Sequence, residues 1–119
     1  MTNLSSVFNE LREILLPFTD ALSVKIDVPD QLYVDTRFIQ KNKQPLFFAA
    51  VQIKKSYVSY HLMPIYQSPN LLTDVSDALK SRMQGKSCFN FKSVEPALFA
   101  ELKQLTEAGL DAYRTQGFV

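Results

Sequence analysis

The polar residues between positions 57 and 92 are the ones whose types could do chemistry. This stretch holds the only histidine of the chain, His61, and its only cysteine, Cys88. An imidazole beside a thiol can hold a thiolate, which is the nucleophile of cysteine enzymes. The same residue types also occur in ordinary cores, where cysteine packs as a small apolar side chain. Because no third group that would orient the histidine can be assigned, the pattern favours a structural role for the pair.

Strand alternation places further polar side chains beside this pair. Successive side chains of a β-strand point to opposite faces, so the strands expected over 57–63 and 87–92 each gather polar residues on one face. In the strand expected over 46–53, Gln52 lies on the same face as Phe48 and Ala50. If the register aligns these faces, they form one polar cluster of Gln52, Ser59, His61, Cys88 and Asn90.

Three cations surround a glycine turn at position 85, namely Lys80, Arg82 and Lys86. Backbone amides at such a turn, with cations nearby, can hold an anion or a carboxylate. Basic side chains near a helix end also complement the helix dipole without any ligand. We expect a small anionic ligand. Arg82 and Lys86 would attract its charge, and the polar cluster would orient it through hydrogen bonds. The expected site comprises His61, Arg82, Lys86 and Asn90, with Tyr60 or Tyr66 as its wall.

The residues that could bind a metal ion in this chain are carboxylates. A structural zinc site wants about four Cys or His ligands, whereas this chain has one residue of each kind. Iron, or another cation that accepts oxygen ligands, could use carboxylates alone. The candidates on or near the first helix are Glu10, Glu13 and Asp20. Such residues are equally typical of the solvated side of an amphipathic helix.

Composition is that of one ordinary globular domain over residues 1–119, with 46% hydrophobic and 21% charged residues. The net charge of +1 lacks the basic excess that nucleic-acid binding needs. The apolar runs are too short to span a bilayer, and the first residues do not have the pattern of a signal peptide. A single cysteine suits a reducing compartment, so we expect a cytoplasmic protein.

The elements that would position these residues alternate in a simple order. Apolar spacing predicts a helix that Ser5 or Ser6 caps and Pro17 ends. Strands are expected over 24–28, 31–39, 46–53, 57–63 and 87–91, with a helix over 77–84 before the last strand and another from Pro96 onward. The apolar run 46–53 predicts a central strand covered on both faces. The order predicts an α+β fold, an antiparallel sheet of about five strands with N- and C-terminal helices packed on it.

Three segments of the chain resemble the YdhG-like family, a domain of unknown function. They are LFFAAVQI over 46–53, YVSYHLMP over 57–64 and RMQGKSCFNF over 82–91. The resemblance extends over nearly the whole chain and implies the α+β fold of that family. Some members are described as frataxin-like iron chaperones, so the resemblance implies iron as a cargo that is carried without catalysis.

Three functions follow as hypotheses. The leading one is a non-enzymatic, cytoplasmic domain that binds a small anionic molecule. The alternatives are frataxin-like iron binding through Glu10, Glu13 and Asp20, and a small enzyme that uses Cys88. Expected partners are a small molecule or a metal ion, and neither nucleic acid nor a membrane. A homodimer is a further expectation, because uncovered strands or apolar helix faces need shielding.

Overall fold

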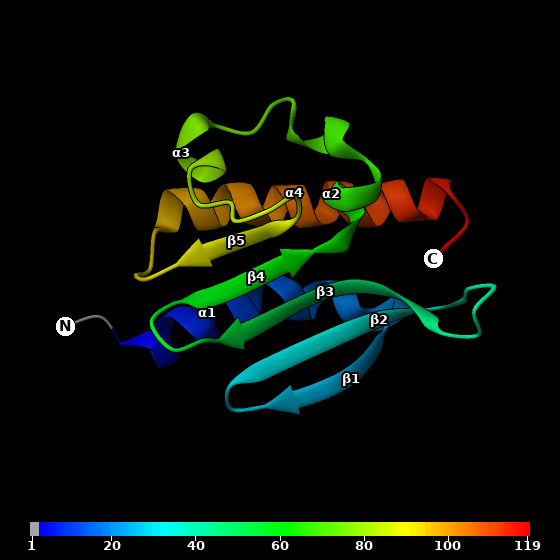
Figure 1. Cartoon of the computed structure of the whole chain (residues 1–119), viewed down its shortest axis with the longest axis horizontal. Helices are drawn as coiled ribbons and strands as arrows, with labels where there is room; N and C mark the ends of the chain where they lie inside the picture. Colours follow the sequence, from blue (N-terminus) through cyan, green and yellow to red (C-terminus); the bar gives the residue numbers. More distant parts are fainter. Residues whose placement is uncertain (1–2) are drawn as a thin grey trace.

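A five-stranded antiparallel sheet carries two long helices on one of its faces (Figure 1). This computed structural model describes residues 3–119. The elements follow in the order α1 (Leu4–Leu15), η1 (Leu16–Ala21), β1 (Ser23–Val28), β2 (Gln31–Ile39), β3 (Pro45–Ile53), β4 (Val58–Leu62), α2 (Met63–Gln67), η2 (Pro69–Leu72), α3 (Asp77–Lys80), β5 (Cys88–Phe91) and α4 (Pro96–Thr115). The elements η1 and η2 are 3₁₀ helices.

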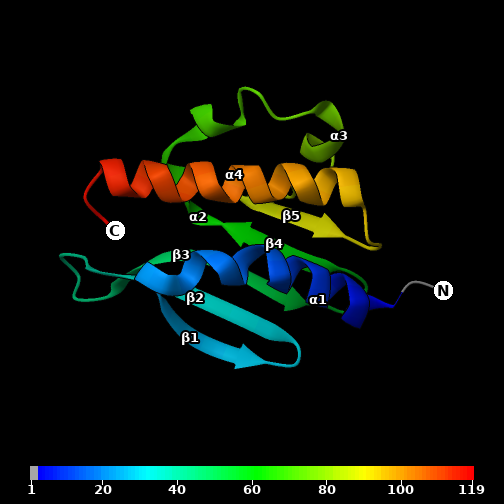
Figure 2. The same ribbon diagram turned by 180° about the vertical axis from the view of Figure 1, so that it is seen from behind.

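The strands lie in the sheet in their order along the chain, so each strand pairs with the next. Seen from behind, α1 and α4 lie side by side in front of the sheet, and among residues 3–119 no helix lies on the opposite face (Figure 2). The predicted α+β class and five-stranded antiparallel sheet are confirmed. Within residues 3–119, no helix combines the length and the apolar character needed to cross a membrane.

Helix α1 turns one apolar side toward the sheet. Its buried residues recur at helical spacing and are Val7, Phe8, Leu11, Ile14 and Leu15. The helix begins earlier than predicted, because Asn3 is its N-cap and accepts a hydrogen bond from the Ser5 backbone N–H at 2.9 Å. The predicted caps Ser5 and Ser6 lie inside the helix and were wrong. Pro17 ends the α-helical geometry as predicted, and the chain continues as η1.

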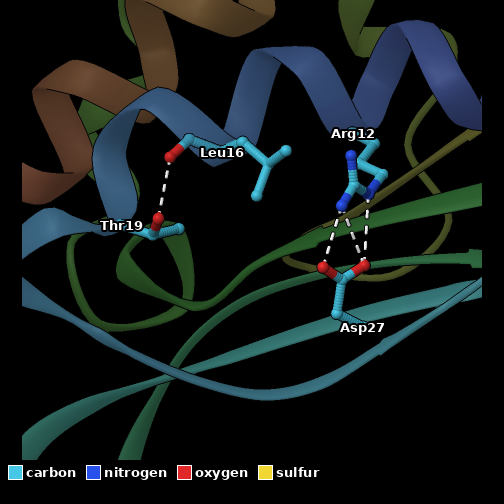
Figure 3. A network of polar contacts seen from close by, with 4 residues as sticks. All are labelled: Arg12, Leu16, Thr19 and Asp27. Carbon is cyan, nitrogen blue, oxygen red and sulfur yellow. Dashed lines mark hydrogen bonds and ion pairs between the residues drawn. The ribbon is translucent and has the colours of Figure 1, made fainter.

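An ion pair joins α1 to β1, and a local hydrogen bond lies within η1 (Figure 3). The Nη2 of Arg12 donates to the two carboxylate oxygens of Asp27 on β1 at 3.0 and 2.8 Å, and Nε donates to Oδ1 at 3.2 Å. The Thr19 hydroxyl donates to the Leu16 carbonyl at 2.8 Å. Because the ion pair is partly exposed, it contributes less than about 1 kcal/mol and mainly orients β1 relative to α1.

Helix α4 packs on the last two strands and completes the core. The hydroxyl of Tyr60 lies 2.7 Å from Oγ1 of Thr106, and neither residue is exposed to solvent. The rings of Phe91 and Phe99 meet edge to face, with centroids 4.9 Å apart. Tyr60 therefore belongs to the core between sheet and helix, and its predicted place in the wall of a ligand site was wrong.

A bulge in β3 reverses which side chains face the helices. The pairing with β2 passes from Ala49 directly to Phe47 and skips Phe48. As a result, Phe48 and Ala49 are both fully buried, while Phe47 is only partly buried on the opposite face. The prediction that Phe48 shares a face with Gln52 was wrong for this reason. The strand predicted over 46–53 is also covered by helices on one face only.

Helix α3 is shorter than the helix predicted over 77–84. Ser76 is its N-cap, since its Oγ accepts a hydrogen bond from the Leu79 backbone N–H at 3.1 Å. The chain then leaves the helix, and segment 82–84 forms backbone hydrogen bonds of 2.8 and 2.9 Å with β5. Gly85, with a φ of +83°, turns the chain back between this segment and β5 instead of capping a helix. Segment 82–84 therefore covers the outer edge of β5.

Residues Met63–Gln67 fold into α2, an element that the sequence analysis did not predict. Strand β4 ends at Leu62 and α2 begins at Met63, with Pro64 in the first helical turn, where proline is well tolerated. Helix α2 lies against α4 at Gly109, where an added Cβ would come within 3.0 Å of the Pro64 Cβ. The absence of a side chain at position 109 is thus what permits the close approach of the two helices.

Candidate functional site

The register of β3, β4 and β5 brings the predicted polar cluster together on the open face of the sheet. One cross-strand row joins Gln52, Ser59 and Asn90, and the next joins Ala50, His61 and Cys88. All of these residues are partly buried, as expected for side chains on an uncovered sheet. The alignment of the polar faces, on which the prediction depended, is therefore confirmed.

An aromatic row extends the cluster toward β2. The ring of Phe47 stacks on Tyr33 with centroids 4.8 Å apart and planes inclined by 23°. On its other side Phe47 meets the His61 ring edge to face, at 4.9 Å. The sequence analysis missed this row because the bulge in β3, which turns Phe47 to the open face, leaves no signal in an apolar run.

Together these side chains line a groove of about 420 Å³, which we call the open-face groove. A volume of this order lies within the range of about 300–1,000 Å³ that small-molecule sites occupy. Besides the polar cluster and the aromatic row, its lining residues are Gln31, Ala50, Lys54, Tyr57 and Gln84. Segment 82–84 thus supplies part of the wall through Gln84, and the turn between β3 and β4 supplies another part.

The open-face groove is nearly free of charge. Of the described residues that line it, Lys54 is the only lysine, arginine, aspartate or glutamate, and its Nζ donates to Gln52 Oε1 at 2.9 Å. Burial lowers the pKa of His61 below its usual 6.5, because desolvation disfavours the imidazolium. His61 is therefore neutral at pH 7. The groove offers hydrogen-bonding groups and aromatic rings, with little electrostatic attraction for an anion.

The geometry of Cys88 does not activate its thiol. Cys88 lies directly opposite His61 in the register. Burial nevertheless raises the pKa of the Cys88 thiol, although a hydrogen bond with Ser59 and the charge of Lys54 act in the opposite direction. A reactive cysteine needs a lowered pKa and a cationic partner. The thiol of Cys88 is therefore protonated and lies beside a neutral imidazole.

Two of the four residues predicted to bind a ligand do not line the open-face groove. Arg82 forms a bidentate ion pair with Glu95, with donor–acceptor distances of 2.8 and 2.7 Å. The Nζ of Lys86 lies 5.7 Å from the ring centroid of the exposed Tyr66. His61 and Asn90 do line the groove. The four residues predicted to bind one ligand therefore do not lie in one site.

A second hollow of about 400 Å³ continues from the groove toward the start of α4. Arg82, Glu95 and Lys92 belong to its lining. It shares Tyr57, Gln84 and Asn90 with the open-face groove, so the two hollows border each other. The positive charge of Arg82 is already neutralised there by Glu95.

The carboxylates predicted to bind iron are not gathered in one place. Glu10 and Glu13 are exposed on α1, and Asp20 is exposed on η1. Among residues 3–119, no group of three or more His, Cys, Asp or Glu side chains lies close enough to hold a metal ion. These three residues therefore do not form a shared ion site in the structure, and iron binding stays a prediction.

The fold and the groove define a two-layer α+β domain in which helices cover one sheet face and leave the other open. In comparisons with known proteins, no family model, no curated protein and no solved structure matches the chain. The resemblance to the YdhG-like family therefore stays a prediction.

Proposed function

We propose that this protein is a non-catalytic binding domain that holds a small molecule in the open-face groove. The observation that carries the proposal is the convergence of His61 and Asn90, from two neighbouring strands, on a concave surface between partly buried aromatic rings. Ligand pockets typically combine apolar surface with a few convergent polar groups. A cytoplasmic location is part of the proposal, since a reducing compartment suits a lone thiol.

The support for binding rather than catalysis comes from the state of the groups in the groove. Burial alone lowers the pKa of His61, and no hydrogen bond to another described residue contributes to this shift. A general base is normally oriented by a third group. The thiol of Cys88 has a raised pKa, so it is protonated at neutral pH. These groups can recognise a ligand without transforming it.

The test is a small-molecule screen read by ¹H–¹⁵N NMR on the full chain. We expect at least one compound from a mixture of charged and uncharged fragments to shift the amides of β3, β4 and β5 around the groove. The variant Asn90→Leu should lose this response, whereas Lys86→Gln, which changes an exposed residue outside the groove, should retain it.

Two outcomes would overturn the proposal. A screen whose responses all fall outside the open-face groove would show that the groove is not the binding site. Chemical conversion of a bound compound that is lost in Cys88→Ser would show that the domain is an enzyme. In both cases an unchanged far-UV circular dichroism spectrum of each variant serves as the folding control.

A further inference from the structure

The groove contains carboxamide groups that the protein itself does not use. Between residues 3 and 119, the carboxamides that form hydrogen bonds belong to Asn3, Gln40, Asn42, Gln52 and Gln116. Those of Gln31, Gln84 and Asn90 are therefore free, and all three line the groove. A carboxamide presents a donor and an acceptor side by side in one plane. Free carboxamides in a groove favour a ligand with the matching pair of groups.

The aromatic row adds a preference for a flat ligand. Tyr33, Phe47 and His61 form a continuous series of rings along the groove floor, with successive centroids 4.8 and 4.9 Å apart. Flat heterocycles interact with such rings through offset or edge-to-face contacts. Proteins that recognise unpaired nucleobases use the same combination, in which rings are stacked and their edges are hydrogen-bonded.

The charge distribution decides against a negatively charged ligand. Lys54 already donates to Gln52, Arg82 is paired with Glu95, and Lys86 lies outside the groove. A carboxylate placed among these groups loses hydration and gains only the attraction of Lys54, which is exposed and therefore screened by solvent. The groove thus favours the uncharged member of any pair of ligands that differ only by such a group.

We infer that the ligand of the open-face groove is an uncharged, planar heterocycle that carries a neighbouring hydrogen-bond donor and acceptor, as a lactam or a ring carboxamide does. This inference rests on the proposed function and names the class of ligand for the same site. Asn90 pairs with the donor–acceptor edge of the ring, and the aromatic row contacts its face.

Matched compounds test the inference by isothermal titration and by the NMR shifts of groove amides. Nicotinamide is compared with nicotinate, in which a carboxylate replaces the carboxamide, and uracil with orotate, in which a carboxylate is added to the same ring. We expect the uncharged member to bind in the groove and its anionic partner to bind about tenfold more weakly, owing to the unpaired buried charge. Maltose serves as an uncharged probe that is rich in hydroxyls but has no planar ring.

Two variants of Asn90 locate the interaction. Asn90→Leu removes both the donor and the acceptor, and Asn90→Asp keeps the shape but replaces the donor by a charged acceptor. Each should weaken uracil or nicotinamide about tenfold, while Lys86→Gln should leave both affinities unchanged. Equal affinity of wild type and both Asn90 variants would overturn the assigned pairing.

The outcomes separate this inference from the proposed function. Tighter binding of nicotinate and orotate in the groove, or binding of maltose there without either heterocycle, would overturn the ligand class and leave a binding domain. Responses of every probe outside the groove would overturn both. Binding of the uncharged heterocycles in the groove, lost in the Asn90 variants, would support both.

Discussion

The buried contact between Tyr60 and Thr106 gives a prediction whose size follows from the direction of one hydrogen bond. The Thr106 hydroxyl donates its only hydrogen to the Leu102 carbonyl at 2.8 Å, so it must accept from Tyr60 at 2.7 Å. Tyr60→Phe then removes one hydrogen bond and leaves the threonine donor satisfied. Thr106→Val leaves the tyrosine O–H without a partner in a fully buried position.

These two substitutions should therefore have unequal effects on the free energy of unfolding. We expect Tyr60→Phe to lower it by about 1 kcal/mol, the usual net contribution of a hydrogen bond. Thr106→Val should lower it by about 2 kcal/mol, because an unsatisfied buried donor costs its desolvation. The double variant should lose about 1 kcal/mol, since it leaves no unpaired donor, which corresponds to a coupling of about 2 kcal/mol.

Urea unfolding followed by far-UV circular dichroism measures the three differences from shifts in the midpoint at constant slope. A Thr106→Val protein that is as stable as Tyr60→Phe would refute the assigned direction of the hydrogen bond. Additive effects in the double variant would refute the coupling itself. The contact braces β4 against α4 from the side opposite His61, so a loss here should leave the groove residues in place.

Three further predictions concern separate parts of the molecule. Gly109→Ala should destabilise the fold by about 1–3 kcal/mol in urea unfolding, because the new Cβ would lie 3.0 Å from Pro64; a neutral effect would show that α2 yields easily. Arg12→Gln should lower the free energy of unfolding by less than about 1 kcal/mol and by less still in 1 M salt, since its pair with Asp27 is partly exposed; a larger, salt-independent loss would contradict this. The imidazole of His61 should titrate below pH 6.5 by NMR, and because its folded pKa lies below its unfolded value, its contribution to stability is present above about pH 6.5 and is lost as the pH falls through the folded pKa. A midpoint above 6.5 would show that a negative group faces the ring.

Much of the fold and part of the site could be predicted because regular alternation is visible in a sequence. Ser59, His61, Cys88 and Asn90 lie in strands without bulges, so parity alone places them on one face. Phe47 could not be placed in this way, because an apolar run reads the same with or without the extra residue of a bulge.

The partners of charged side chains were equally invisible in the sequence. Arg82 is thirteen residues away from Glu95, and their ion pair depends on how segment 82–84 returns along β5. The predicted helix over 77–84 would have kept Arg82 on a helical surface near Lys86. Local helical propensity was overridden here by strand pairing, which satisfies backbone groups that a short exposed helix would leave to water.

Helices cover one face of the sheet and leave the other face to the groove. The residues that stabilise the fold and the residues that line the groove therefore occupy alternate positions of the same strands. In β4, Val58, Tyr60 and Leu62 are buried beneath the helices, while Ser59 and His61 alternate with them on the groove side. Substitutions on the groove side leave the packed layer untouched. The groove-side positions of β3, β4 and β5 could therefore be randomised while the buried positions stay constant. The resulting variants would present different groove surfaces on one stable framework.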